Sequence, residues 1–155
     1  MVKVEHIHPM LVHFPIVLLL TAAIIDALIL FHKDNDLAAR NCLARTGLAA
    51  LLLGTAFAII AAAFGDMALD IAIDKGFDKA PLTEHEGLAG LTIGVFGVLA
   101  LGQLIAAWRG IHLGGKPGKL FLAAILLGCA LLIVTAYHGG GLVYELGVNV
   151  TGVTP

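Results

Sequence analysis

Four long apolar segments, separated by short polar stretches, dominate the hydrophobic pattern of the chain. They cover about residues 8–31, 37–64, 84–108 and 119–138. Each holds the roughly 20 predominantly apolar residues that a helix needs to cross a bilayer. The polar stretches between the segments are residues 32–36, 65–83 and 109–118. The pattern therefore predicts an all-α fold, an integral membrane bundle of four up-and-down helices in a single domain spanning residues 1–155.

The segment ends carry further signals. An acid recurs every four residues after the second span, at Asp66, Asp70, Asp74 and Asp78. This spacing predicts a short amphipathic helix between the second and third spans, whose acidic face is either solvated or a docking surface for a basic partner. Thr83 is expected to cap the third helix, with Glu86 completing a capping box. Gly139, Gly140 and Gly141 are expected to end the fourth helix, which makes residues 139–155 an ordered C-terminal tail.

Composition supports the membrane class. Of the 155 residues, 59% are hydrophobic and 13% are charged, whereas soluble domains are about 45–50% apolar and about 25% charged. The mean hydropathy is +0.98. The net charge of −2 gives no indication of nucleic-acid binding. Cys42 and Cys129 are expected at different depths, so no disulfide is predicted, and the chain contains no C-x-x-C-H motif for covalent haem attachment.

The basic residues predict the orientation. Six of the nine lie in or beside the first and third connections: Lys33, Arg40, Arg45, Arg109, Lys116 and Lys119. The other side of the membrane would hold three basic and eight acidic residues. Because cytoplasmic loops carry an excess of Lys and Arg, both termini and the middle connection are expected outside the cytoplasm. For a bacterial protein this means the periplasmic side of the inner membrane.

This threading brings histidines from three helices to the outer end of the bundle. His8 and His13 begin the first span, His85 opens the third, and His138 ends the fourth. Histidine is the commonest metal ligand, and ionisable groups inside a membrane are costly enough to indicate function. Bonds to backbone or water are the structural alternative for His8 and His13. The sequence does not choose between His13 with His85, which lie on diagonal helices, and His13 with His138, which match in depth.

Small and aromatic residues accompany these histidines. Gly87, Gly90, Gly94 and Gly97 share one broad face of the third helix, which favours close helix packing or room for a flat macrocycle. Gly139 and Gly140 follow His138 and would allow a ligand to approach the backbone. Tyr137 and Tyr144 are either membrane-interface aromatics or donors to a ligand's carboxylates.

One acid lies within a predicted span. Asp26 is toward the inner end of the first span, and Arg45 is near the start of the antiparallel second span. We expect the two to form a structural ion pair.

Three stretches resemble a family of small bacterial membrane proteins catalogued as domain of unknown function 2231. They are the N-terminal HPMLVHFP, the His-Glu-Gly opening of the third helix, and the terminal YHGGGLVYELGVNV. The resemblance covers nearly the whole chain and implies a four-helix membrane domain. It also implies that longer relatives join this domain to c-type cytochrome modules. It brings no established activity, so the histidine roles rest on the residues themselves.

Three functions remain open. The first is a protein that binds one or two haems b and transfers electrons at the periplasmic face, because a bundle core supplies facing axial ligands and an apolar slot. The second is a site for a copper, zinc or iron ion on His8, His13, His85 and His138, with Glu84, Glu86 or Asp66 nearby. The third is a non-catalytic subunit or scaffold. Transport is weakly indicated, since the spans lack broken-helix signals. We expect an electron carrier more than a stand-alone enzyme, with the lipid bilayer, a c-type cytochrome or a second copy in a homodimer as partners.

Overall fold

The computed structural model describes residues 4–32, 36–153 and 155 as a helical bundle. Its elements are a 3₁₀ turn, η1 (Val4–His6), and five α-helices: α1 (Ile7–Leu11), α2 (His13–Phe31), α3 (Cys42–Asp74), α4 (Lys79–Arg109) and α5 (Gly115–Tyr144). Four segments are long and apolar enough to cross a membrane, and the first of them joins α1 to α2 as Ile7–Phe31. The predicted all-α membrane fold with four spans is confirmed.

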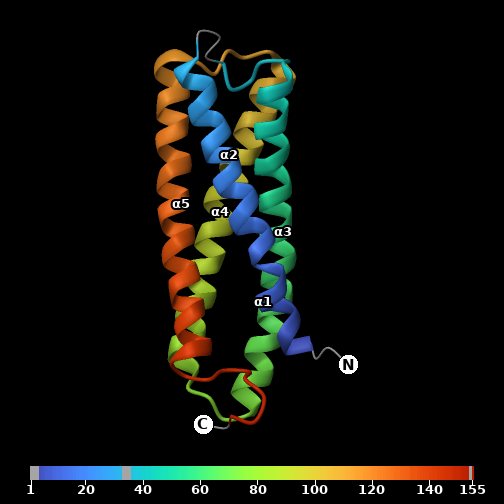
Figure 1. Ribbon diagram of the computed structural model, residues 1–155, viewed down its shortest axis with the longest axis vertical. Helices are drawn as coiled ribbons and strands as arrows, with labels where there is room; N and C mark the ends of the chain where they lie inside the picture. The colour runs from blue at the N-terminus through green and yellow to red at the C-terminus, as the bar shows by residue number, and fades with distance from the viewer. Residues whose placement is uncertain (1–3, 33–35, 154) are drawn as a thin grey trace.

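The four long helices lie side by side and alternate in direction (Figure 1). α2 contacts α3 and α5, and α4 contacts the same two helices, so α2 and α4 lie diagonally across the bundle. The main core contains Leu19, Leu51, Phe96 and Ile125, one from each long helix and all fully buried. We call the end with both termini and the α3–α4 connection the terminal end, and the end with the other two connections the loop end.

Several glycines allow close packing in the bundle, three of them beside the core helices. A Cβ added at Gly54 would lie 2.8 Å from Leu19, and one at Gly47 would lie 2.9 Å from Ile25. At Gly128 it would lie 3.1 Å from Phe96. Small residues let membrane helices approach closely enough for their side chains to interlock. The close contacts therefore form at glycines of α3 and α5.

The segment expected to form a separate amphipathic helix is instead the end of α3, which continues without a break to Asp74. Asp66, Asp70 and Asp74 are exposed on its last turns. A helix of 33 residues is about 50 Å long, whereas the bilayer core is about 30 Å thick. The last turns therefore extend beyond the apolar layer, where an exposed acidic face is stable.

Two predicted helix ends were wrong. α4 begins at Lys79 because Asp78 caps it by accepting from the Ala80 N–H at 3.1 Å. Thr83 lies inside the helix and donates to the Lys79 carbonyl. α5 runs through the three glycines to Tyr144, because the backbone hydrogen bonds of a helix are satisfied within the segment and so persist where water is scarce.

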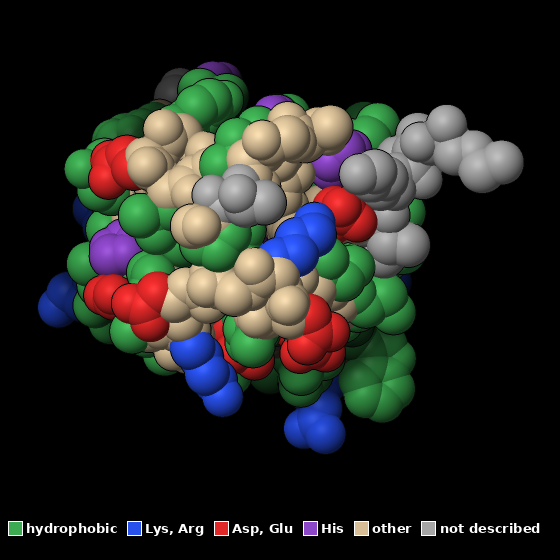
Figure 2. Space-filling model, turned by 90° about the horizontal axis from the view of Figure 1, so that it is seen from below, with side chains coloured by type: hydrophobic (Ala, Val, Ile, Leu, Met, Phe, Trp, Pro, Cys, Tyr) green, Lys and Arg blue, Asp and Glu red, His purple; other side chains and the backbone are tan. Residues whose placement is uncertain are grey.

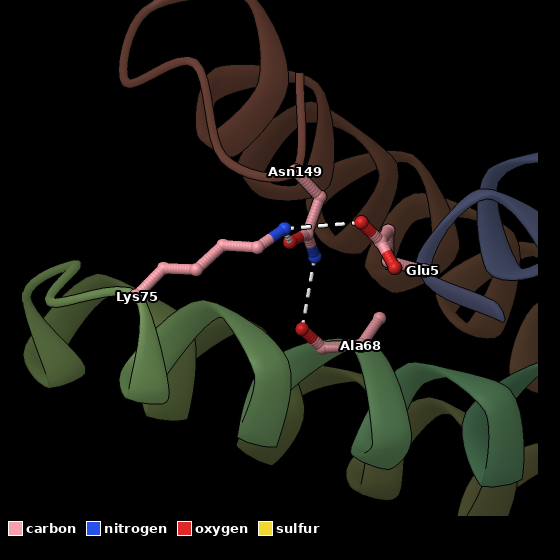
Figure 3. A network of polar contacts seen from close by, with 4 residues as sticks. All are labelled: Glu5, Ala68, Lys75 and Asn149. Carbon is pink, nitrogen blue, oxygen red and sulfur yellow. Dashed lines mark hydrogen bonds and ion pairs between the residues drawn. The ribbon is translucent and has the colours of Figure 1, made fainter. Parts of the chain in front are cut away.

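The C-terminal tail is ordered and packs on α3. The Asn149 amide donates to the Ala68 carbonyl at 2.9 Å, and the Lys75 ammonium lies 3.0 Å from Glu5 Oε1 and 3.4 Å from Asn149 Oδ1 (Figure 3). Val148 is buried in a small cluster with Ala72, Phe77 and Leu82. These contacts join the tail, α3 and the start of the chain at the terminal end.

At the loop end, Asp36 connects the two loops. Its carboxylate accepts from the N–H groups of Leu113 at 2.8 Å and Ala38 at 3.0 Å, and its other oxygen lies 3.1 Å from His112 Nδ1. Partial burial acts to raise the pKa of Asp36, but the two N–H groups and His112 outweigh it and hold the pKa below its usual value.

Candidate functional site

His8 lies in α1, at the terminal end of the first span. Pro9 is in the first turn of α1 and Pro15 in the first turn of α2, where a missing N–H costs least. Val12 between them keeps helical dihedral angles, so the two helices form one span. His8 Nδ1 is 2.7 Å from the Ala61 carbonyl of α3. Because a carbonyl only accepts, we assign the proton to Nδ1, which leaves Nε2 with a free lone pair.

His85 of α4 meets His8 across the bundle. The two ring centres are 6.2 Å apart, and the ring planes are inclined at 78°. His85 Nδ1 is buried and has no hydrogen-bond partner. A buried polar atom without a partner is rare in native structures and needs an explanation. His85 therefore presents one unpaired ring nitrogen, Nδ1, beside His8, while the Thr135 backbone of α5 lies close enough to the His85 ring to interact with it.

Two glycines make room for this pair. A Cβ at Gly139 of α5 would lie 2.8 Å from His85 Cε1, and one at Gly65 of α3 would lie 3.0 Å from the His8 ring. Real Cβ atoms essentially never come within 3.0 Å of another residue's heavy atom. Gly139 thus belongs to the site through its missing side chain. The backbones of α3 and α5 form the walls on which the two rings lie.

His138 lies beside the pair but is more exposed. Together with His8 it is close enough to act electrostatically on His85. Its Nδ1 is 3.9 Å from Glu84 Oε1, a long ion-pair distance, and 35% of its side chain is accessible. The Tyr137 ring is edge-on to it at 6.1 Å. The structure therefore brings His8, His85 and His138 together from α1, α4 and α5.

His13, the strongest candidate ligand on sequence grounds, does not join this group. It is exposed at the start of α2. His8 and His13 are five residues apart, or about 140° around a helix. When one faces the bundle, the other faces away.

The glycines of α4 do not line the site either. Gly90 and Gly94 are exposed, and a Cβ at Gly87, Gly90, Gly94 or Gly97 would meet nothing within 4 Å. Gly90 and Gly94 lie about 140° and 180° around α4 from His85. This face neither packs within the chain nor borders the histidine pair.

The aromatic residues and Gly140 border a different feature. Tyr137, Gly140, Gly141, Tyr144 and Glu145 line an open hollow of about 230 Å³ on α5. Tyr137 is 75% and Tyr144 is 90% exposed, which suits interface aromatics. A second hollow, lined by Arg45 and Trp108 among others, lies at the loop end.

The sequence did not reveal the Ala61 carbonyl or Gly65 as parts of the site. Ala61 lies inside a uniformly apolar run and acts through its backbone carbonyl, which has no sequence signal, and Gly65 is a single glycine at the edge of that run. Across residues 4–32, 36–153 and 155, no three or more His, Cys, Asp or Glu side chains form a group that could hold a metal ion by themselves.

The family model described as "Predicted membrane protein (DUF2231)" matches residues 5–152. No curated protein and no solved structure matches the chain. The match contains all five α-helices of the bundle and all the histidines of the site. The chain therefore belongs to the DUF2231 family of predicted membrane proteins.

Proposed function

We propose that the protein is an electron carrier that binds one haem b, which His8 and His85 would hold. The observation that supports this most is the 6.2 Å separation of the two ring centres. At the zinc–nitrogen distance of about 2.0–2.1 Å known for histidine, two imidazoles that hold one metal can have ring centres roughly 6 Å apart, so the two rings lie close enough to share one metal.

The hydrogen bond of His8 supports the same proposal. A metal-binding histidine almost always donates its other ring N–H to a carbonyl, a carboxylate or water, which fixes the ring and raises its basicity. The 2.7 Å bond from His8 Nδ1 to the Ala61 carbonyl has this form. It would leave Nε2 for the iron.

The number of ligands favours haem over a bare ion. The porphyrin would supply four nitrogens to its iron, so the protein would need to supply only two further ligands, which His8 and His85 could provide. A bare zinc or copper ion needs three or four protein ligands, and the described residues contain no such group. When bound, haem supplies one-electron redox chemistry. The roles of this chain are to hold the two imidazoles and to exclude water with the helices around them.

The bare ion is the second candidate, favoured by one observation. His138 lies beside His85 and would be a third ligand if its side chain turned inward. The exposed Glu84 next to it could complete the set.

The proposed location follows from the charges. Figure 2 shows acidic side chains around the terminal end, several of them on α3 and the tail. Exposed basic residues gather instead at the loop end, among them Arg40, Arg45 and Arg109. Because cytoplasmic loops carry an excess of Lys and Arg, we propose that the terminal end lies on the periplasmic side of a bacterial inner membrane. An acidic rim there would attract a basic redox partner such as a c-type cytochrome. This partner and a homodimer stay predictions.

The test is a reduced-minus-oxidised visible spectrum of detergent-purified protein from a haem-replete host, with elemental analysis of the same sample. We expect sharp haem bands at about one iron per chain. Colourless protein with about one zinc or copper per chain would replace haem with the bare-ion site. Colourless protein with neither would refute both and leave the scaffold function.

A further inference from the structure

Asp26 of α2 and Gln103 of α4 form a buried polar pair at the end of the bundle opposite to the histidines. Both side chains are completely buried. α2 and α4 are diagonal in the bundle, so the pair lies at its centre. The Gln103 side chain is the polar group that faces the Asp26 carboxyl. Neither residue contributes to the site described above.

The pair has more buried hydrogen-bond acceptors than donors. Gln103 Nε2 donates to the Leu37 carbonyl at 3.1 Å. Three buried oxygens have no partner: Asp26 Oδ1, Asp26 Oδ2 and Gln103 Oε1. All three are acceptors if the acid is ionised, and Gln103 Nε2 has only one N–H left. An ionised Asp26 would therefore leave the pair short of donors.

Arg45, the cationic side chain predicted to pair with Asp26, does not supply the missing hydrogen-bond donors, because it is exposed. The α3 residue that faces Asp26 is Gly47, whose added Cβ would lie 3.0 Å from Oδ1. Arg45 is two residues from Gly47, or about 200° around the helix, so it points away. The expected Asp26–Arg45 ion pair is wrong.

The other charged groups that the structure describes at this end also lie away from the pair. Arg40, Arg109, Lys116 and Lys119 are exposed on the α2–α3 connection, α4 and α5. Asp36 is occupied with His112 and the loop backbone. Asp26 has no ion pair with any residue in the described part of the chain. An unpaired charge inside a membrane bundle is expensive.

We propose that Asp26 and Gln103 form a proton-binding site within the membrane. One proton converts the Asp26 carboxylate to a carboxylic acid, whose O–H donates to Gln103 Oε1. The second N–H of Gln103 Nε2 then donates to the remaining carboxyl oxygen. This two-point acid–amide pair gives all three orphaned oxygens a partner and removes the buried charge. A hard metal cation is a poorer occupant, because such ions take about six to eight oxygens.

The surroundings fit this small occupant. Gly47 leaves space beside Oδ1 that any larger residue would fill. The bond from Gln103 to Leu37 ties the pair to the α2–α3 connection. This inference is independent of the proposed haem site.

The test is infrared spectroscopy of the full-length protein in lipid vesicles at neutral pH, in H₂O and in D₂O. We expect a protonated-carboxyl C=O band that shifts in D₂O and is absent in Asp26→Asn. Asparagine has nearly the shape of the protonated acid and keeps a donor and an acceptor, so this variant should fold. The band should move to higher frequency in Gln103→Leu, which removes the bond to the acid. The surface variant Asp70→Asn is the control and should leave the band unchanged.

Two results would overturn the proposal. One is a neutral-pH spectrum in which Asp26→Asn removes no protonated-carboxyl band. The other is a band that disappears on addition of sodium chloride at constant pH, because the site would then be a sodium site. If Gln103→Leu does not fold, the comparison of wild type with Asp26→Asn still decides.

Discussion

Replacing Gly139 with alanine should disrupt the contact between His85 and His8. The new Cβ would lie 2.8 Å from His85 Cε1, 3.3 Å from Nε2 and 3.4 Å from Nδ1. Because the whole ring lies against this position, the ring itself must move. Overpacking of this kind typically costs about 1–3 kcal/mol, and alanine regains up to about 1 kcal/mol of helix propensity. The net expectation is a loss of about 0–3 kcal/mol.

Gly140→Ala is the matched control. Its Cβ would be 4.0 Å from Tyr144, an ordinary contact, so the variant keeps the propensity gain of up to about 1 kcal/mol without a clash. Unfolding in mixed detergent micelles, followed by circular dichroism, measures both variants against wild type. The predicted difference between them is about 1–3 kcal/mol, in favour of Gly140→Ala. Equal stabilisation by both would refute the close approach of α5 to His85.

Three other predictions test the loop end, the tail and the orientation. The pKa of Asp36 is held below its usual value. The stabilisation that the ionised Asp36 contributes is therefore complete above the unfolded pKa of about 4 and is lost as the pH falls further. Thermal melts should show Asp36→Asn less stable than wild type at pH 7, and the stabilities of the two proteins should converge in acid. Asn149→Ala removes the hydrogen bond to α3 and places alanine at a φ of 58°. The tail should then be held to α3 less strongly by about 1–2 kcal/mol, and limited proteolysis should cut it faster. An unchanged cleavage rate would contradict this. In intact cells, an impermeant maleimide should label Val153→Cys and leave native Cys42 unlabelled; labelling of Cys42 alone would reverse the proposed orientation.

The spans could be predicted from sequence because a bilayer imposes a length and a composition on each helix. Helix ends were harder to predict. α3 continues past its apolar part because nothing in residues 65–74 breaks a helix except one glycine. α5 continues through three glycines because the penalty measured for glycine in water does not apply in full where unpaired backbone groups are costly. In both helices the preference of glycine for ending a helix is outweighed by the free energy of continued backbone hydrogen bonding.

From the sequence, the site could be assigned to one end of the bundle, but the residues that face each other there could not be chosen. Threading placed His8, His85 and His138 at the same end, and the structure places them there. The choice between His8 and His13 depends on which side of the first span packs inward, and the apolar pattern is too uniform to show it. The same limit applies to Asp26 and Arg45. Antiparallel helices gave them similar depths, but the direction of each side chain around its helix decides the contact.

We propose that His8 and His85 hold one haem iron and that His13 does not. Visible absorption during titration of the detergent-solubilised protein with haem tests it most directly, on His8→Ala, His85→Ala and His13→Ala beside wild type. We predict saturation at one haem per chain with a six-coordinate spectrum in wild type and His13→Ala. His8→Ala and His85→Ala should each lose that spectrum. Loss in His13→Ala with retention in His8→Ala, or equal spectra in all four proteins, would contradict the pairing.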